Sequence, residues 1–269
     1  MCGRYAITSS PEAIRALFRY GEQPNFPPRH NVAPTQPVPV VRLADGVRQF
    51  ALLRWGLIPA WVKDPRGFSL LINARGESVC DKPAFRNAMK RRRCLLPADG
   101  FFEWQATGGP TGPEGPKGSK RPFFIRKRGG GALAFAGLWE AWMGPNGEEM
   151  ETVCIVTTRA NHTLAPIHDR MPVIVPPEGF DLWLDADHVD ALTASALIAP
   201  APDGLLEAWE VSTAVNRTAN DSPDLLARLT PAADSTAPLP APAKPAAKPA
   251  TPPRRAQKPK GAPDQGSLF

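Results

Sequence analysis

The chain has 269 residues, of which 42% are hydrophobic, and a formal net charge of +6. This length suits one large domain or two small ones; no apolar run is long enough to span a membrane, and the polar start is not a secretory signal. The four cysteines form no CxxC pair or zinc-spaced His/Cys cluster. They therefore argue against a disulfide framework and a metal site, and they favour a reducing, cytoplasmic compartment.

The N-terminus reads Met1-Cys2-Gly3-Arg4. A cysteine in second place is small enough for the initiator methionine to be removed, which would leave a thiol and a free α-amine on one residue. Their unperturbed pKa values, about 8.5 for the thiol and roughly 7.7–8.0 for the amine, leave both partly nucleophilic at neutral pH. Such a pair condenses with an aldehyde to a thiazolidine. Taken alone, Cys2 is also consistent with an incidental cysteine.

Short β-type runs bounded by Gly and Pro dominate the chain, and helices are few. The stretch Ser9-Ser10-Pro11-Glu12, a capping box with proline in the first turn, predicts a helix that begins near these residues and runs to about Tyr20. Further helices are expected over Lys82–Arg91, over Phe180–Leu184 and from Ser222 onward, and a Gly/Pro-rich loop over 106–121. The strands are expected at Val38–Val41, Phe50–Trp55, Arg93–Leu96, Phe123–Arg126, Ala134–Trp139, Thr152–Thr157 and Val173–Val175.

These elements show no βαβ alternation and no phosphate-binding glycine loop. We therefore expect an α+β fold in which predominantly antiparallel sheets form a barrel-like core with a few flanking helices, and we expect no cofactor. From Pro231 onward the composition turns to Pro, Ala, Lys and Arg, which is typical of a disordered, extended segment. The predicted organisation is a folded domain over 1–230 and a tail over 231–269, and the tail carries +4 of the net charge.

Several stretches combine polar, charged and aromatic residues in a way that packing of a hydrophobic core alone would not require. They are Cys2-Gly3-Arg4, Leu71-Ile72-Asn73-Ala74-Arg75-Gly76-Glu77, Pro97-Ala98-Asp99-Gly100-Phe101-Phe102-Glu103-Trp104 and Ala165-Pro166-Ile167-His168-Asp169-Arg170-Met171-Pro172, supported by Arg54–Trp61 and Asn216–Pro223. In this order and spacing they resemble the SRAP (SOS response-associated peptidase) family. The resemblance covers nearly all of residues 1–230 and leaves out the tail.

The resemblance implies a protein that attaches itself covalently to abasic sites in single-stranded DNA, in the cytoplasm and at the nucleoid. It assigns the trapping of the sugar aldehyde to Cys2, the orientation of its amine to Asn73, and catalytic roles to Glu103 and His168. It also implies that Arg4 and Arg75 grip phosphates, and that Arg86 contacts the DNA backbone.

The residue types suit this chemistry independently. Imine formation needs proton transfers that fit a carboxylate with a pKa raised by burial, such as Glu103. A histidine such as His168 suits opening of the sugar ring, and the amide of Asn73 orients a partner without titrating. The alternatives are a surface strand glutamate, a turn histidine and a turn asparagine.

Two tryptophans and a basic run each allow a structural and a DNA-binding role. Trp55 and Trp61 are either core residues or platforms against bases beside the lesion. Because Val62 stands where several relatives have a second tryptophan, a wedge at that position is in doubt. The run Arg86–Arg93 would by default be a solvated helix face, but here we expect it to border a DNA groove, because neutralising phosphates supplies most non-specific affinity.

Two other functions stay open. Cys2 could act as the nucleophile of a thiol peptidase or N-terminal-nucleophile hydrolase, or the chain could bind single-stranded DNA without a covalent bond. Separately, the terminal Gln265-Gly266-Ser267-Leu268-Phe269 resembles the peptide with which bacterial repair proteins dock on the replicative sliding clamp. Gln265, Leu268 and Phe269 would then bind the clamp, with the tail as a flexible tether.

Overall fold

The computed structural model describes residues 2–108 and 118–229. The strands are β1 (Tyr5–Ile7), β2 (Arg29–Val32), β3 (Pro37–Ala44), β4 (Val47–Trp55), β5 (Asn73–Arg75), β6 (Arg93–Ala98), β7 (Gly100–Ala106), β8 (Lys120–Lys127), β9 (Leu133–Met143), β10 (Glu149–Arg159), β11 (Arg170–Pro172) and β12 (Leu206–Glu210). The α-helices are α1 (Pro11–Phe18), α2 (Arg86–Arg91), α3 (Phe180–Leu184) and α4 (Ala191–Ser195), and the 3-10 turns are η1 (Pro65–Gly67), η2 (Gly76–Ser78), η3 (Pro177–Gly179), η4 (Thr213–Asn216) and η5 (Pro223–Leu226).

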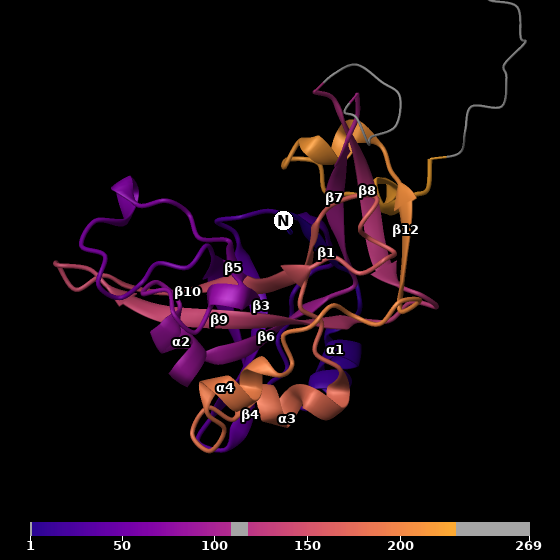
Figure 1. Ribbon diagram of the computed structural model, residues 1–269. Helices are drawn as coiled ribbons and strands as arrows, with labels where there is room; N and C mark the ends of the chain where they lie inside the picture. The colour runs from indigo at the N-terminus through magenta and orange to yellow at the C-terminus, as the bar shows by residue number, and fades with distance from the viewer. Residues whose placement is uncertain (1, 109–117, 230–269) are drawn as a thin grey trace, which may run out of the picture. The chain divides into compact units, whose positions relative to one another are not determined.

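The strands form two sheets (Figure 1). One has five strands in the order β12-β8-β7-β1-β2, and the other has seven, in the order β11-β10-β4-β3-β6-β9 with β5 beside β10. All pairings are antiparallel except those of β10 with β4 and with β5. Helices α1, α3 and α4 gather on one side of the seven-stranded sheet (Figure 1). The predicted α+β class with mainly antiparallel sheets is confirmed.

The alternation of side chains along the strands divides the core into layers. On β3, Val40 belongs to the layer shared by the two sheets, and Val41 belongs to the layer beneath the helices. On β7, Phe101 packs into the shared layer, while Phe102 joins a smaller cluster that includes Trp209. The two sheets therefore enclose one common, barrel-like core, and Cys2 lies in it.

Six of the seven predicted strand runs fall inside observed strands. The seventh, Val173–Val175, is wrong: β11 ends at Pro172, and beyond it only an isolated bridge joins Ile174 to Phe135. Proline in the third position of β11 and at Pro176 limits the ladder there, because proline has no N–H to donate.

The helix predictions need boundary corrections. Helix α1 starts where expected, with proline in its first turn, but its N-cap is Ser10, which accepts from the N–H of Ala13, one residue after the serine that the capping-box spacing to Glu12 selects. The helix ends at Phe18 because Arg19 takes the left-handed conformation with φ 59°. Helix α2 starts at Arg86, since turns occupy the residues from Lys82 to Phe85. The segment from Ser222 forms the 3-10 turn η5 instead of an α-helix.

The predicted tail, with Gln265, Leu268 and Phe269, lies outside the described residues, as does most of the predicted loop 106–121. The flanks of that loop are described, and they are the end of β7 at Ala106 and the start of β8 at Lys120. The domain boundary at residue 230 stays a prediction. Within residues 2–108 and 118–229, no helix is long and apolar enough to cross a membrane.

Candidate active site

Cys2 is buried in the shared core, and a side chain from a neighbouring strand is hydrogen-bonded to its backbone. The Nδ2 amide of Asn73 donates a hydrogen bond of 2.9 Å to the backbone carbonyl of Cys2. Asn73 itself is fixed because β5 pairs in parallel with β10, where it lies opposite Ile155. The Cys2 thiol is buried and lies 3.9 Å from the carbonyl oxygen of Arg4.

The surroundings of the thiol disfavour its ionised form. Burial raises the pKa of the Cys2 thiol well above its ordinary range, and the nearby charge of Glu103 raises it further. Desolvation penalises a thiolate, and a second negative charge repels it. The Cys2 side chain is therefore a neutral thiol at physiological pH, and Glu103 lies close enough to influence it.

Glu103 is the buried carboxylate of the site. It lies on β7, and its side chain is only 2% exposed. Burial raises the pKa of Glu103 to about 7. A carboxyl group with this pKa is present in both protonation states near neutral pH, so it can both accept and deliver a proton.

His168 completes the arrangement from a turn that follows β10. Its backbone N–H donates to Leu164 O over 2.9 Å, which closes the turn. The Nε2 atom lies 3.9 Å from Oε2 of Glu103. Burial lowers the pKa of His168, so the imidazole is mainly neutral near pH 7. The prediction that Glu103 and His168 belong to one site agrees with this geometry, and their catalytic roles remain predictions.

A pocket of ≈ 390 Å³ opens over these two residues, and it is lined by Arg4, Glu103, Trp104, Lys120, His168 and Asn216. This volume falls in the range of small-molecule sites. Sequence reasoning missed Lys120 and Asn216 as lining residues, and it used Trp104 only as part of a motif. The indole Nε1 of Trp104 donates to Oδ1 of Asn216 over 2.8 Å, which joins β7 to η4. The sequence feature that could have identified Asn216 is its place in the supporting stretch Asn216–Pro223.

Arg4 lines the pocket, but protein groups hold much of its guanidinium. Its Nη1 donates to Oδ1 of Asn31 and to the carbonyl of Val215, each over 2.8 Å. The guanidinium carbon also lies 6.0 Å from the ring centre of Trp104, within cation–π range. Arg4 therefore fastens β1 to the segment around η4 and brings a positive charge to the pocket at the same time.

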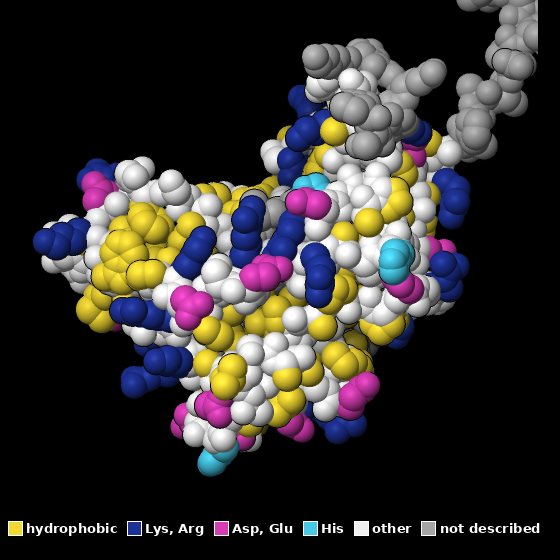
Figure 2. Space-filling model, in the orientation of Figure 1, with side chains coloured by type: hydrophobic (Ala, Val, Ile, Leu, Met, Phe, Trp, Pro, Cys, Tyr) yellow, Lys and Arg dark blue, Asp and Glu magenta, His cyan; other side chains and the backbone are white. Residues whose placement is uncertain are grey.

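The other predicted basic contacts divide into exposed and structural residues. Arg75 and Arg86 are exposed. Arg93 is 1% exposed, and its guanidinium donates to four backbone carbonyls, those of Trp183, Met89, Asp185 and Val189. The prediction that Arg93 borders a DNA groove is therefore wrong. Figure 2 shows Lys and Arg side chains spread across the middle of one face, with acidic side chains among them.

Trp55 is a core residue, so of its two expected roles the contact with bases is wrong. Its side chain is 0% exposed and packs edge-on against Tyr5, with ring centres 5.4 Å apart. Its indole N–H is already used, since it donates to the carbonyl of Ile72 over 3.0 Å. A ring buried between two sheets has no face to offer a base.

Trp61 is 59% exposed and projects from a segment that starts at the Leu57–Leu71 bridge. Its ring meets Phe68 edge-on, with centres 5.7 Å apart. The neighbouring Val62 is buried against Ile58 and Trp142. Val62 thus anchors the segment in the core, and Trp61 is the aromatic residue of this segment that stays exposed and could contact a base.

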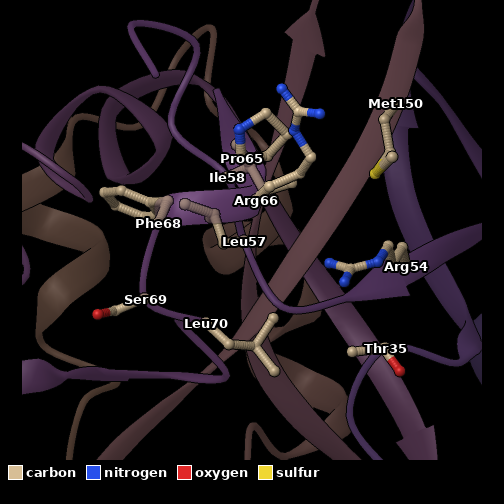
Figure 3. Close-up of a pocket in the computed structure, with 10 residues that line it drawn as sticks. All are labelled: Thr35, Arg54, Leu57, Ile58, Pro65, Arg66, Phe68, Ser69, Leu70 and Met150. Carbon is tan, nitrogen blue, oxygen red and sulfur yellow. The ribbon is translucent and has the colours of Figure 1, made fainter. Parts of the chain in front are cut away.

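Beside this segment lies a second pocket (Figure 3). Leu57, Leu70 and Phe68 line it on the side of the projecting segment, and Arg54 and Met150 line it from the strands. The pocket does not include any of the four predicted catalytic residues. Among the described residues, no group of three or more His, Cys, Asp or Glu side chains could hold a metal ion.

Glu103, with its raised pKa, and His168 line one pocket, and the charge of Glu103 acts on the buried thiol of Cys2, which is not itself among the lining residues. The family model of the SOS response associated peptidase (SRAP) matches residues 1–218. The chain belongs to this family, as its motifs predicted.

Several relatives carry the name abasic site processing protein. YoqW of Bacillus subtilis is 36% identical over 84% of this chain and 99% of its own length. HMCES of Gallus gallus is 32% identical over 84% of this chain and 77% of its own length. Among crystal structures, a phage-related protein from Bordetella bronchiseptica matches with a TM-score of 0.62 at 32% identity, over 78% of this chain and 94% of that one. A protein from Bacteroides thetaiotaomicron matches with a TM-score of 0.74 over 85% of this chain and all of its own, and at 23% identity this shows the fold alone.

Proposed function

We propose that the protein processes abasic sites in single-stranded DNA by forming a covalent thiazolidine crosslink through Cys2 after removal of Met1. The crosslink would shield the lesion from strand cleavage during replication. The names of the relatives support the substrate class. The observation that carries the proposal is the 2.9 Å bond from Asn73 to the Cys2 carbonyl, and it is supported by the charge of Glu103, which acts on the Cys2 thiol.

The reaction starts at the amine. The free α-amine of Cys2 adds to the aldehyde of the ring-opened deoxyribose, and loss of one water gives an imine. The Cys2 sulfur then bonds to the imine carbon while the thiol proton passes to nitrogen, which closes the five-membered ring. The net change is one water released, without oxidation or reduction, so hydrolysis can reverse it.

Two side chains suit the proton transfers. Glu103, with a pKa of about 7, can take a proton from the attacking amine and return it to the departing hydroxyl. His168, with its lowered pKa, can act on the sugar's ring oxygen to expose the aldehyde. Because both line the same pocket, one bound sugar can meet both groups.

The competing proposal, a thiol peptidase, fits the site less well. Peptide hydrolysis by cysteine requires the thiolate as the first nucleophile. Burial and Glu103 both raise the pKa of the Cys2 thiol, so the thiolate is scarce at neutral pH. Thiazolidine formation begins with the amine and needs the sulfur only after the imine has formed, which accommodates a protonated thiol.

The test uses a single-stranded oligonucleotide with one abasic site and an otherwise identical intact one. We expect a heat-stable shift on denaturing gels with the abasic oligonucleotide only. The Cys2→Ala variant should give no shift, and an uncleaved N-terminal tag should also prevent it because the amine is then blocked. Efficient crosslinking by the tagged protein would rule out the thiazolidine, and peptide cleavage without any shift would favour the peptidase.

The predicted sliding-clamp contact is a separate proposal about Gln265, Leu268 and Phe269, which lie outside the described residues. It is supported only by the sequence of the chain end. Fluorescence titration of a labelled tail peptide with the bacterial clamp tests it. Binding should disappear when Leu268 and Phe269 are both alanine, since they supply the apolar anchors.

A further inference from the structure

Glu77 and Arg170 form an ion pair beside the site, and the proposed reaction has so far given them no role. Glu77 lies in η2, directly after β5, and Arg170 begins β11. The two side chains bind in a bidentate manner, with distances of 2.6 Å and 2.8 Å between guanidinium nitrogens and carboxylate oxygens. The Nη2 of Arg170 also donates to Thr157 O over 2.8 Å. The Arg170 side chain is 12% exposed, so the guanidinium is held between η2 and β10.

The backbone N–H of Arg170 in turn favours one tautomer of His168. The N–H of Arg170 donates to Nδ1 of His168 over 2.9 Å. A backbone amide is always a donor, so Nδ1 must act as an acceptor in this arrangement. The proton of the neutral imidazole is then on Nε2, the nitrogen that faces Oε2 of Glu103 at 3.9 Å.

A second group competes for the same nitrogen. Oδ1 of Asp169 lies 2.9 Å from Nδ1 of His168, and this carboxylate is 87% exposed. An ionised carboxylate can only accept a hydrogen bond, so it favours a proton on Nδ1. The nitrogen Nε2, which faces Glu103, would then carry no proton. The imidazole therefore has two alternative tautomers, one favoured by the Arg170 amide and the other by Asp169. Lys120, which lines the same pocket, adds a positive charge on the solvent side.

We propose that Glu77 is a positioning residue that, through Arg170, holds His168 in the tautomer with its proton on Nε2. The role of that proton in the reaction rests on the function proposed above, whereas the tautomer itself does not. Glu77 clamps the Arg170 side chain, the clamped residue keeps its N–H directed at Nδ1, and Nε2 keeps its proton next to Glu103.

This arrangement gives one short segment two tasks. Asn73, in β5, holds the Cys2 carbonyl, and Glu77, in η2, holds Arg170. Because the segment pairs with β10 through Asn73, Ala74 and Arg75, both anchors move with one strand. The relative placement of Cys2 and His168 thus depends on the segment from Asn73 to Ser78.

The direct test is ¹⁵N NMR of the imidazole of His168 in the full-length protein without DNA, at about pH 8 where the ring is neutral. In the unmodified protein we expect the Nε2–H tautomer. In Glu77→Ala the signal should shift towards the Nδ1–H form, since Asp169 then competes against a loosened amide. Adding Asp169→Asn to Glu77→Ala should restore the Nε2–H form, because the competing charge is gone.

The matched control is Glu151→Ala. Glu151 is likewise a partly exposed carboxylate bound to an arginine, Arg42, at 2.5 Å, and it lies outside the catalytic pocket. This variant should leave the His168 signal unchanged. An unchanged tautomer in Glu77→Ala would overturn the proposal, as would a shift that Asp169→Asn fails to reverse. If Glu77→Ala proves unfolded, Glu77→Gln, which keeps an acceptor for Arg170, is measured in the same way and should show a smaller shift of the same sign.

Crosslinking gives the functional readout. We expect the rate to fall about tenfold in Glu77→Ala and to recover in the double variant. This is less than the roughly 100-fold or more for loss of a general acid or base, because the imidazole stays in place and only its tautomer shifts. Affinity for intact single-stranded DNA should not fall, because the change removes a negative charge. If the unmodified protein does not crosslink at all, the proposed function fails while the NMR result still decides the role of Glu77.

Discussion

The side-chain amide of Asn73 holds the backbone carbonyl of Cys2 at 2.9 Å, although the two residues are 71 positions apart. The Oδ1 of the same amide is buried and has no hydrogen-bond partner among the described residues. A buried acceptor without a donor costs free energy, so its presence in a folded protein calls for an explanation. Under the proposed mechanism, an amine on Cys2 is a donor that Oδ1 could accept from.

Asn73→Asp should damage both stability and crosslinking. The change replaces the donating Nδ2 with an acceptor, so two oxygens would face each other across the former hydrogen bond. We expect a loss of about 1–3 kcal/mol in the free energy of unfolding and a slower crosslinking reaction. Thermal unfolding and a crosslinking time course measure the two effects. Equal stability and equal rate would show that the bond does not position Cys2.

Glu103→Gln should change the pH dependence of stability. Burial raises the pKa of Glu103 from 4.5 to about 7, so the folded state binds a proton more tightly than the unfolded state. The associated stability is fully present below pH 4.5 and is lost as the pH rises through about 7. Glutamine does not titrate. Relative to the unmodified protein, the variant should therefore gain up to about 3 kcal/mol between acidic pH and about pH 8.

Denaturant unfolding at several pH values measures this difference for Glu103→Gln. The control is Glu151→Gln, because Glu151 is a partly exposed carboxylate paired with Arg42. A stability difference between Glu103→Gln and the unmodified protein that does not vary with pH would mean that the carboxyl has an ordinary pKa.

His168→Ala should slow crosslinking while leaving DNA binding largely intact. The imidazole is 26% exposed and faces Glu103, so its loss removes a proton donor or acceptor from the pocket. General acid–base groups contribute roughly 100-fold or more to rate. Single-turnover crosslinking and anisotropy with intact DNA separate the two quantities. A variant that loses only affinity would identify His168 as a DNA contact.

The sequence predicted secondary structure and motif residues well, but it did not predict which residues from distant segments lie together in the fold. The alternation of Phe101 and Phe102, or of Val40 and Val41, follows from strand periodicity, and these runs predicted the sheets. The burial of Trp55 and Arg93 depends on the second sheet and on α3, which no local pattern reveals. Similarly, Asn216 and Lys120 reach the pocket only through the pairing of β7, β8 and the η4 segment, so neither could be placed from its own neighbours.

Arg4 and Arg75 should respond differently to loss of charge, although the sequence assigned both to phosphates. Arg75 is exposed, so Arg75→Ala should weaken DNA binding and reduce its dependence on salt while leaving stability unchanged. Arg4 donates to Asn31 and Val215. Arg4→Ala should therefore also destabilise the fold, by about 1–3 kcal/mol, because Oδ1 of Asn31 loses its donor, whereas the Val215 carbonyl keeps the one from Nδ2 of Asn31.

Denaturant unfolding, together with anisotropy titrations at several salt concentrations, measures both variants. Arg4→Lys is the matched comparison. Lysine keeps the positive charge, but its single ammonium lacks the forked donors with which the guanidinium reaches Asn31 and Val215. We expect Arg4→Lys to retain the salt dependence of binding and still lose stability. If Arg4→Ala were as stable as the unmodified protein, the hydrogen bonds to Asn31 and Val215 would not fasten β1 to the η4 segment, and Arg4 would act on DNA alone.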